Sequence, residues 1–371
     1  MKLNCSKNDL IQALQITGRA VATKPQTPIL SGIYMKASNG KLELQATDYE
    51  IGVLCKIDAD VEEEGIIVAP GRYFSEVSKN LPGDTVTLEN NNMDNTIKIS
   101  SGSANFTLLK MNAEEFPCIK KLEGATNFTI RDTILKKLIR KTSFACANDE
   151  NRLIFTGCLM ELEFEAIRMA ATNTHRLSLD QEMLEGYEGE KKQFIVPSRI
   201  LGELEHVLTS EIPEDVTVNA TYNEISFSFD NLYLTSRLIE GQFPDYHRVI
   251  PPDFKTRVTI ETSAFLAAVN RVSLIARSSE YNVIKLDFGM GQVHISSNSQ
   301  EIGHAEETVP VVIDGPDVVI AFNATYLADV LKHIDSKNFY LSLNASLSPA
   351  AIREEEDEAF IYIVTPVRIS N

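Results

Sequence analysis

The 371-residue sequence contains only five cysteines, and no two of them form a C-x-x-C pair. Scattered thiols in odd number indicate neither a disulfide framework nor a zinc site. No apolar run approaches the length of a membrane-spanning helix, and the first residues lack the apolar core of a signal peptide. We therefore expect reduced cysteines, a cytoplasmic location, no contact with membranes, no metal and no other cofactor.

Motifs of catalysis are also missing. The six histidines stand singly, without metal-binding spacing, and neither a P-loop nor a G-x-S-x-G occurs. Gly289-Met290-Gly291 lacks the third glycine of a dinucleotide-binding loop, so a hairpin turn is favoured. For the acidic run Glu354–Glu358, a solvated loop is favoured over a metal site. We expect a protein that is not an enzyme, and an enzyme with repeated domains, such as a metal-dependent hydrolase, is the alternative.

The sequence does contain a threefold internal repeat. Helix-like stretches begin at Pro70, Pro197 and Asn323, which are 127 and 126 residues apart. A second landmark recurs at steps of 125 residues, as Ala46-Thr47-Asp48, Ala171-Thr172-Asn173 and Ser296-Ser297-Asn298. A repeat of this length is too long for a solenoid and indicates three copies of a whole domain.

Each repeat shows the same order of elements: a helix, alternating strands, a second helix and more alternating strands. The first helices are predicted over Lys7–Thr23, Arg131–Ala145 and Thr262–Arg277. Because strand segments outnumber helices, the predicted class is α+β, with three similar domains that each pack two helices on antiparallel sheets. The polar segment at residues 121–126 and the pair Pro251-Pro252 place the domains at 1–122, 123–251 and 252–371.

The net charge of −17 opposes binding to nucleic acid, but the charge is unevenly distributed. Fourteen basic and six acidic residues lie on or beside the six predicted helices, which leaves the helices at +8 and the rest of the chain at −25. Cationic helices on an anionic body favour contact with the phosphates of a nucleic acid, without recognition of the base sequence. The alternative is that these are ordinary helix faces exposed to solvent. The helix residues expected to face DNA are Arg72, Lys136, Lys137, Arg140, Lys141, Arg199 and Arg271.

The helix from Arg131 shows this pattern most clearly. On a helical wheel, Ile134, Leu135, Leu138 and Ile139 fall on one face, and the four basic residues from Lys136 to Lys141 fall on the other. The apolar face is predicted to pack on a sheet, and the basic face is predicted to remain accessible.

Four stretches resemble the β subunit of bacterial DNA polymerase III, the sliding clamp: Thr27–Leu30, Ala171–Leu177, Leu238–Tyr246 and Thr365–Arg368. The resemblance covers the whole chain and implies the DNA clamp fold, with a head-to-tail homodimer closed into a ring around duplex DNA. It implies a processivity factor that tethers the DNA polymerase III alpha subunit, the clamp loader, and other polymerases and repair proteins carrying short linear motifs. Lys24 and Arg152 would contact DNA, and Phe106 and Leu108 would meet the partner's Leu274 and Ile275.

The resemblance also implies one groove, between the second and third domains, that binds these motifs. Thr174 stands where relatives often have glycine, and Thr365 and Val367 stand where some have methionine, which predicts a stiffer groove with a narrower choice of peptides. Residues 369–371 continue the chain past the last matching stretch. A scaffold that never meets DNA is a further alternative, which the basic helix faces oppose. The implied groove wall comprises Phe155, Thr172, Thr174, His175, Arg176, Leu177, Pro244, Arg248, Val249, Val364, Pro366, Val367 and Arg368.

Overall fold

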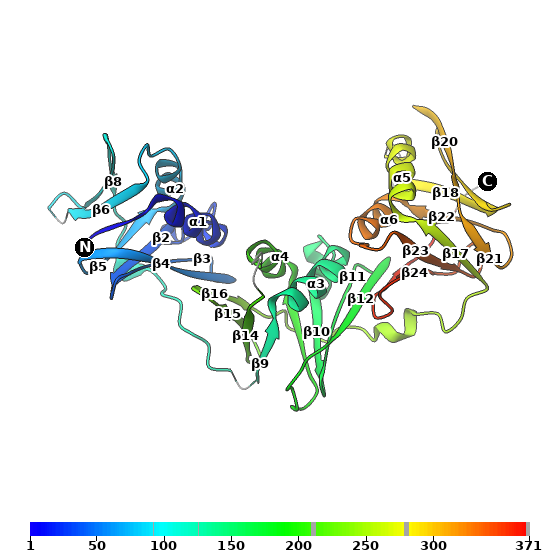
Figure 1. The fold of residues 1–371 in the computed structure, drawn as a ribbon, viewed down its shortest axis with the longest axis horizontal. Helices are drawn as coiled ribbons and strands as arrows, with labels where there is room; N and C mark the ends of the chain where they lie inside the picture. The colour runs from blue at the N-terminus through cyan, green and yellow to red at the C-terminus, as the bar shows by residue number, and fades with distance from the viewer. Residues whose placement is uncertain (92, 125, 209–212, 278–281, 369–371) are drawn as a thin grey trace. The chain divides into compact units, whose positions relative to one another are not determined.

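The computed structural model describes residues 1–91, 93–124, 126–208, 213–277 and 282–368. These residues form antiparallel strands and six α-helices, in the order that the sequence predicts for each repeat, except that a further strand precedes the first helix of each repeat (Figure 1). The α+β class is therefore confirmed. The helices are α1 (Lys7–Thr17), α2 (Gly71–Lys79), α3 (Asp132–Thr142), α4 (Ser198–Val207), α5 (Thr262–Ala276) and α6 (Ala324–Leu331).

The chain folds into two compact units that do not follow the sequence repeat. The first unit comprises Met1–Asp132 and His206–Leu238, and the second comprises Thr133–Glu205 and Ile239–Asn371. The second repeat is thus divided: its first strand, Thr126–Arg131, and its last strands belong with the first repeat, and the strands between them belong with the third.

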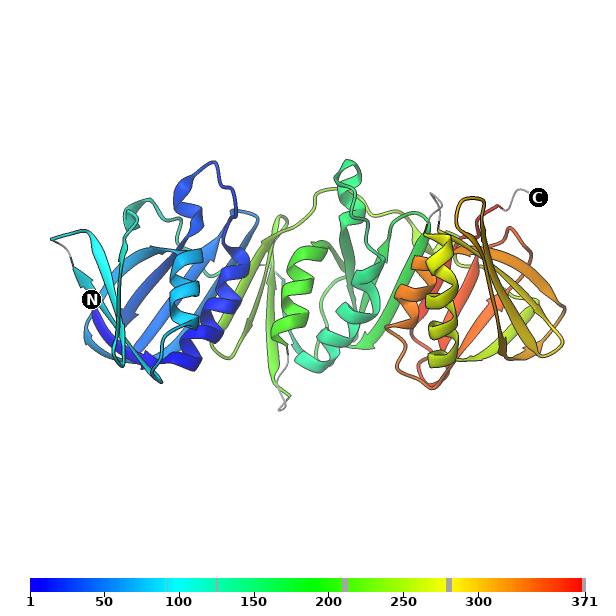
Figure 2. The ribbon, with the colours of Figure 1, turned by 90° about the horizontal axis from the view of Figure 1, so that it is seen from above.

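The first unit is built on one twelve-stranded sheet with the main order β8-β7-β6-β1-β4-β16-β15-β14-β9. Strand β16 of the second repeat pairs with β4 of the first, with Leu234 opposite Val53, so the sheet continues from one repeat into the next. Helices α1 and α2 lie side by side over it (Figure 2). Its strands are β1 (Lys2–Ser6), β2 (Gly32–Ser38), β3 (Lys41–Thr47), β4 (Ile51–Glu63), β5 (Gly65–Pro70), β6 (Thr85–Asn91), β7 (Thr96–Ser101), β8 (Ala104–Leu109), β9 (Thr126–Arg131), β14 (Asp215–Ala220), β15 (Glu224–Phe229) and β16 (Leu232–Arg237).

The second unit contains a nine-stranded sheet, β13-β10-β11-β12-β25-β24-β23-β17-β21, and a four-stranded sheet, β20-β19-β18-β22. Here β12 of the second repeat pairs with β25 of the third, with Leu177 opposite Ile363. Helices α5 and α6 lie side by side over the third repeat. The strands are β10 (Gly157–Glu163), β11 (Ala166–Thr172), β12 (Arg176–Met183), β13 (Lys192–Pro197), β17 (Thr256–Glu261), β18 (Val283–Gly289), β19 (Gln292–Ser299), β20 (Gly303–Pro310), β21 (Val312–Asp314), β22 (Val318–Asn323), β23 (Asn338–Leu343), β24 (Ala350–Glu354) and β25 (Ile361–Val364).

The first helices of repeats one and two are shorter than predicted. Helix α1 ends at Thr17 and α3 at Thr142, and each continues only as a short 3-10 turn. The Thr17 hydroxyl donates to the Ala13 carbonyl at 2.7 Å, and the Thr142 hydroxyl donates to the Leu138 carbonyl at 2.6 Å. Such a bond from a threonine hydroxyl to the carbonyl four residues earlier slightly destabilises a helix and often bends it.

The segment Gly289-Met290-Gly291 forms a hairpin turn, as predicted. It connects β18 to β19, and Met290 and Gly291 have φ of 51° and 73°. Two successive left-handed residues are typical of the tight turn that joins antiparallel strands.

Candidate binding groove and basic helices

A hollow of about 580 Å³ lies in the second unit, where β12 pairs with β25. Its lining is largely apolar, with arginine and histidine side chains among the apolar ones. Nine of the thirteen residues predicted for the groove wall line it: Phe155, Thr172, Thr174, His175, Arg176, Leu177, Pro244, Arg248 and Val249.

The turn between β11 and β12 forms one wall. The Thr172 hydroxyl donates to the Arg176 carbonyl at 2.6 Å, and the Asn173 carboxamide accepts from the His175 and Arg176 amides. Thr174 has φ of 77°, a left-handed conformation that favours glycine. Side-chain hydrogen bonds therefore hold a strained turn at the groove, and the Thr365 amide fixes it further by donating to the His175 carbonyl at 2.9 Å.

Arg176 is buried in this wall. Its guanidinium donates to Asp329 at 2.8 Å and to the Phe144 carbonyl at 2.6 Å, and it lies over the Tyr326 ring. Its Nε has no hydrogen-bond partner among the described residues. An unpaired buried N–H is costly, so an acceptor on a bound ligand would be favoured here.

The opposite wall comes from the 3-10 turn Tyr246–Val249 and the residues before it. The Tyr246 hydroxyl donates to the buried Glu161 carboxylate, and burial together with this bond raises the pKa of Tyr246. Arg248 pairs with Asp245 at 3.0 Å and is highly exposed, and half of the Val249 side chain is exposed. The Phe155 and Phe243 rings meet edge to face. These contacts leave an apolar floor beneath charged, accessible rim residues.

Four predicted wall residues do not line the hollow: Val364, Pro366, Val367 and Arg368. Val364 is completely buried in the core of the third repeat, because successive residues of β25 point to opposite faces and Ile363 is the one that faces the groove. The Val367 amide is bound to the Ala321 carbonyl of β22. Residues 369–371 lie outside the described residues.

Sequence reasoning missed nine lining residues. The Pro251-Pro252 pair had been noticed as a domain boundary, Phe243 lies in a stretch that carries the resemblance, and Thr365 had been named at the groove, so a signal existed for them. Ile363 could have been found from strand alternation, and Pro349 had no local signal. The missed residues are Phe243, Asp245, Tyr246, Ile250, Pro251, Pro252, Pro349, Ile363 and Thr365.

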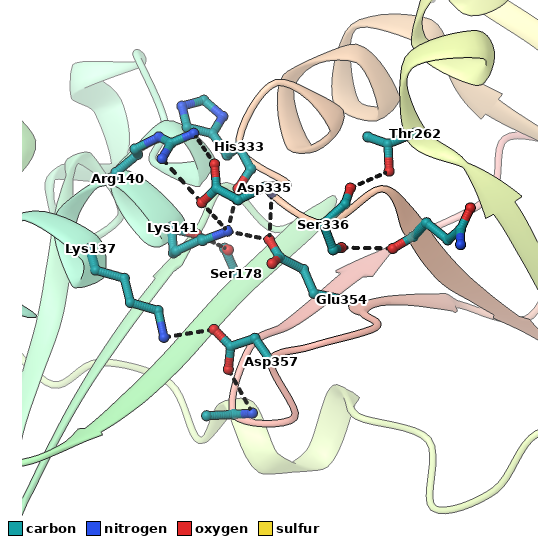
Figure 3. Close-up of polar contacts among 12 residues, drawn as sticks. Lys137, Arg140, Lys141, Ser178, Thr262, His333, Asp335, Ser336, Glu354 and Asp357 are labelled. Atoms are coloured by element: carbon teal, nitrogen blue, oxygen red, sulfur yellow. Dashed lines mark hydrogen bonds and ion pairs between the residues drawn. The ribbon is translucent and has the colours of Figure 1, made fainter.

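The basic face of α3 is only partly accessible, which corrects the prediction (Figure 3). Lys141 is 2% exposed, forms ion pairs with Glu354 and with Asp335, and donates to the His333 carbonyl. On a helical wheel Lys141 lies only about 20° from Ile134, so its position belongs to the edge of the apolar face. The buried ammonium is tolerated because two carboxylates and a carbonyl satisfy it.

Lys137 and Arg140 are also engaged within the unit. Lys137 pairs with Glu182 and with Asp357, and Arg140 forms a two-pronged pair with Asp335. Burial would raise the pKa of Asp335, but the Arg140 and Lys141 bonds lower it below its ordinary value. Among the described residues, Lys136 makes no ion pair.

These contacts change the interpretation of the acidic run as well. The prediction of a solvated loop is wrong for Glu354, which is buried against Lys141, and for Asp357, which binds Lys137. We define the ion cluster as Lys137, Arg140, Lys141, Asp335, Glu354 and Asp357. Asp180 lies close to its edge: it is fully buried, one of its carboxylate oxygens has no partner among the described residues, and burial raises its pKa to about 7.

The other residues predicted to face DNA have accessible side chains. Lys24, Arg152 and Arg199 are exposed, Arg72 is exposed beside Glu76, and Arg271 pairs with Glu307 at 2.5 Å. Their contact with DNA stays a prediction.

The residues predicted for the dimer contact lie at accessible places. Phe106, 38% exposed, and the half-buried Leu108 are on β8, which forms the edge of the twelve-stranded sheet. Leu274 on α5 is 60% exposed, and Ile275 is half-buried. The four-stranded sheet ends at β20, which packs against α5.

The part of the chain that the structure describes has two further properties. It contains no helix that is both long and apolar enough to span a bilayer. It also contains no group of three or more histidine, cysteine, aspartate or glutamate residues arranged to hold a metal ion.

Comparison with known proteins gives matches along the whole chain. Models of the N-terminal, central and C-terminal domains of the DNA polymerase III beta subunit match residues 1–120, 129–245 and 247–368. The beta sliding clamp of Bacillus subtilis is 34% identical over 378 residues, covering 99% of this chain and 100% of that protein. The prediction of three similar domains in one chain is confirmed.

Solved structures agree with this match. The sliding clamp of Bacillus subtilis superimposes with a TM-score of 0.93 at 33% identity, and the DNA polymerase III beta subunit of Thermotoga maritima with 0.91 at 30%. In both cases the alignment covers 100% of each chain.

Proposed function

Because this chain belongs to the DNA polymerase III beta subunit family, the bacterial beta sliding clamps, we propose that it is a DNA sliding clamp. Two copies close into a ring around duplex DNA and tether the replicative polymerase as a processivity factor in the cytoplasm. The chain has no catalytic site of its own, and its domains span residues 1–122, 123–251 and 252–371. The observation that carries the proposal is the full-length match to three successive clamp domains.

The groove in the second unit supports the tethering function. An apolar hollow of about 580 Å³, with Arg248 at its rim and Arg176 in its wall, suits a short extended peptide that carries large apolar side chains. Burying one Leu or Phe side chain contributes about 1.5–3 kcal/mol, so one motif binds moderately and can exchange. We propose that the alpha subunit, the clamp loader, and other polymerases and repair proteins take turns in this groove.

Ring closure is supported by the unpaired edge of β8, because an exposed strand edge can pair with another chain. Replacing Leu274 and Ile275 with glutamate should give monomers, measured as native mass at micromolar protein. The matched control is Leu347→Glu, which changes another exposed leucine of the third repeat. A double variant that remains dimeric would place the subunit contact elsewhere.

DNA retention should depend on topology rather than on base recognition. A ring loaded on nicked circular DNA should stay bound, and it should leave once the circle is cut. Binding to a short linear duplex should be weak and should fall steeply with salt. Equal retention on cut and uncut circles contradicts the encircling model, and nuclease or ATPase activity of the pure protein contradicts the absence of catalysis.

A further inference from the structure

Two cysteine thiols lie side by side in the second repeat. Cys146 follows the 3-10 turn Ser143–Ala145, and Cys158 is the second residue of β10. Their sulfur atoms are 3.5 Å apart, and both side chains are buried, with Cys146 at 7% and Cys158 at 0% exposure. We propose that this pair is a site of reversible oxidation whose disulfide changes the affinity of the groove, an inference that rests on the peptide-binding function proposed above.

Packing alone does not require sulfur at these places. The repeat step of 125 residues relates Cys146 and Cys158 to Val21 and Ile33 of the first repeat. Those two side chains also lie together, since each has a carbon atom 3.2 Å from a Cβ built on Gly71. An aliphatic pair therefore fills this position in one repeat, whereas the second repeat places two thiols in hydrogen-bond contact.

The chemistry needs an oxidant, and hydrogen peroxide is a sufficient one. Peroxide converts the Cys146 thiol to a sulfenic acid and releases one water. The Cys158 sulfur then attacks the Cys146 sulfur, the S–S bond forms, and the hydroxyl leaves as a second water. In sum the two thiols lose two protons and two electrons, and peroxide is reduced to two waters. A small dithiol reverses the reaction by exchange.

The order of these steps follows from exposure. Cys146 is slightly exposed and Cys158 is not, so we expect peroxide to meet Cys146 first. The hydrogen bond with Cys146, together with burial, raises the pKa of Cys158 and keeps it a thiol in the reduced protein. Oxidation of Cys146 removes that hydrogen bond, which frees Cys158 to act as the resolving sulfur.

Both ends of the pair are connected to groove walls. The segment between the two cysteines carries Phe155, whose carbonyl accepts from the Ala147 amide at 2.8 Å. Two residues before Cys146, the Phe144 carbonyl accepts from the Arg176 guanidinium at 2.6 Å. Closing the sulfurs from 3.5 Å to a bond of about 2 Å requires the two residues to approach by side-chain rotation and backbone movement together. We infer that this movement displaces Phe155, Arg176 or both.

The test uses the full-length protein with Cys118→Ser, which removes the exposed thiol and leaves the buried Cys5 and Cys55 as internal controls. Hydrogen peroxide should lower the intact mass by two hydrogens, and mass spectrometry of a digest should find Cys146 linked to Cys158. Dithiothreitol should restore the mass. The affinity for the C-terminal tail peptide of the cognate DNA polymerase III alpha subunit should change by at least about threefold between the two forms.

Matched variants copy the first repeat: Cys146→Val and Cys158→Ile should form no linked peptide and should show no effect of peroxide on peptide affinity. The proposal is overturned if Cys146 and Cys158 of the Cys118→Ser protein both remain alkylatable under peroxide conditions that fully oxidise Cys118 of the unsubstituted protein. It is also overturned if the disulfide forms and peptide affinity is unchanged. If the reduced protein does not bind the peptide, the proposed function fails. Disulfide mapping needs no peptide, so it tests the oxidation of the cysteine pair independently.

Discussion

The two units contain equivalent hollows that differ in volume and in lining. The first unit has a hollow of about 350 Å³ where β4 pairs with β16, and the second has the groove of about 580 Å³ where β12 pairs with β25. In both, a tight turn of one repeat meets a sheet strand of the next. The residues match by the repeat steps: Thr47 with Thr172, Pro117 with Pro244, and Glu224 with Pro349.

The backbone of the two turns is the same. The Thr47 hydroxyl donates to the Ile51 carbonyl at 2.7 Å, as the Thr172 hydroxyl does to the Arg176 carbonyl. Tyr49 has φ of 75°, against 77° for Thr174. The repeat therefore reproduces the turn, strain included.

The side chains explain the difference in volume and character. Leu177 corresponds to Gly52, where a Cβ would lie 2.9 Å from Thr235, so no side chain fits. The buried Arg176 with its unpaired Nε corresponds to the apolar Ile51. A repeated fold supplies the hollow twice, and a few side chains restrict the apolar, arginine-lined groove to one copy.

Helices α1 and α3 show a second difference. Thr17 and Thr142 end the two helices in the same way, and the residue before each is Ile16 in α1 and Lys141 in α3. The second unit thus has a buried ammonium where the first has an aliphatic side chain. The ion cluster links α3 of the second repeat to Asp335 and Glu354 of the third.

Breaking the ion cluster should have the largest effect. Lys141→Met leaves Glu354 buried without its cation, so the free energy of unfolding should fall by about 3–5 kcal/mol. Urea denaturation measures it, with Lys136→Met on the same helix as the control that changes stability little. The double variant Lys141→Met with Glu354→Met should recover much of the loss. A loss below 1 kcal/mol for Lys141→Met, on the order of a surface pair, contradicts the buried-pair assignment.

A pH titration should distinguish the second unit from the first. Burial raises the pKa of Asp180 from 3.8 to about 7, so between these values the folded protein keeps a proton that the unfolded chain releases. The contribution of Asp180 to stability is therefore greatest at the acid end and declines as the pH rises to 7, by about 2–4 kcal/mol. The difference in unfolding free energy between the parent and Asp180→Asn, followed from pH 4 to 8, should show this slope. A difference that is independent of pH would mean that Asp180 is ionised throughout.

Peptide binding should separate the two hollows directly. Val249→Asp places a carboxylate in the groove, and affinity for the alpha-subunit tail peptide should fall at least about tenfold, or 1.4 kcal/mol. The repeat step of 127 residues relates Val249 to Leu122, so Leu122→Asp is the matched control in the other hollow. Equal losses of affinity in both variants, or a loss only in Leu122→Asp, would contradict the assignment of the peptide to the groove of the second unit. Calorimetric titration gives the affinities, and native mass checks that both variants remain assembled.

Relieving the strained turns should have the smallest effect. Thr174→Gly and Tyr49→Gly should each be neutral or stabilise by up to about 1 kcal/mol, because glycine accepts a positive φ. Thr174→Ala keeps the strain and serves as control. Thermal unfolding measures the stability of the three variants. A clear destabilisation by Thr174→Gly would show that the Thr174 side chain stabilises the fold by more than the positive φ at this residue costs.

The sequence allowed the fold to be predicted in outline, because helix starts, strand alternation and the repeat are local signals. Nine residues that line the groove were predicted from the family resemblance, because one of the stretches that show this resemblance contains the turn between β11 and β12. Lys141 was misplaced because a helical wheel shows faces and not what covers them, and its partners Asp335 and Glu354 are about two hundred residues away. Val364 was misplaced because the register of β25 against β12 decides which of two adjacent residues faces the groove.

The continuous twelve-stranded sheet has a consequence for any attempt to cut this protein into pieces. A fragment ending at residue 122 would leave β4 without β16 and expose a run of unpaired backbone groups beside buried apolar residues. Such an edge pairs readily with other chains, so the isolated first domain should aggregate or exchange strands. A co-expressed second piece that carries β14 to β16 should restore solubility. The repeated domain and the compact structural unit are therefore different segments of this chain.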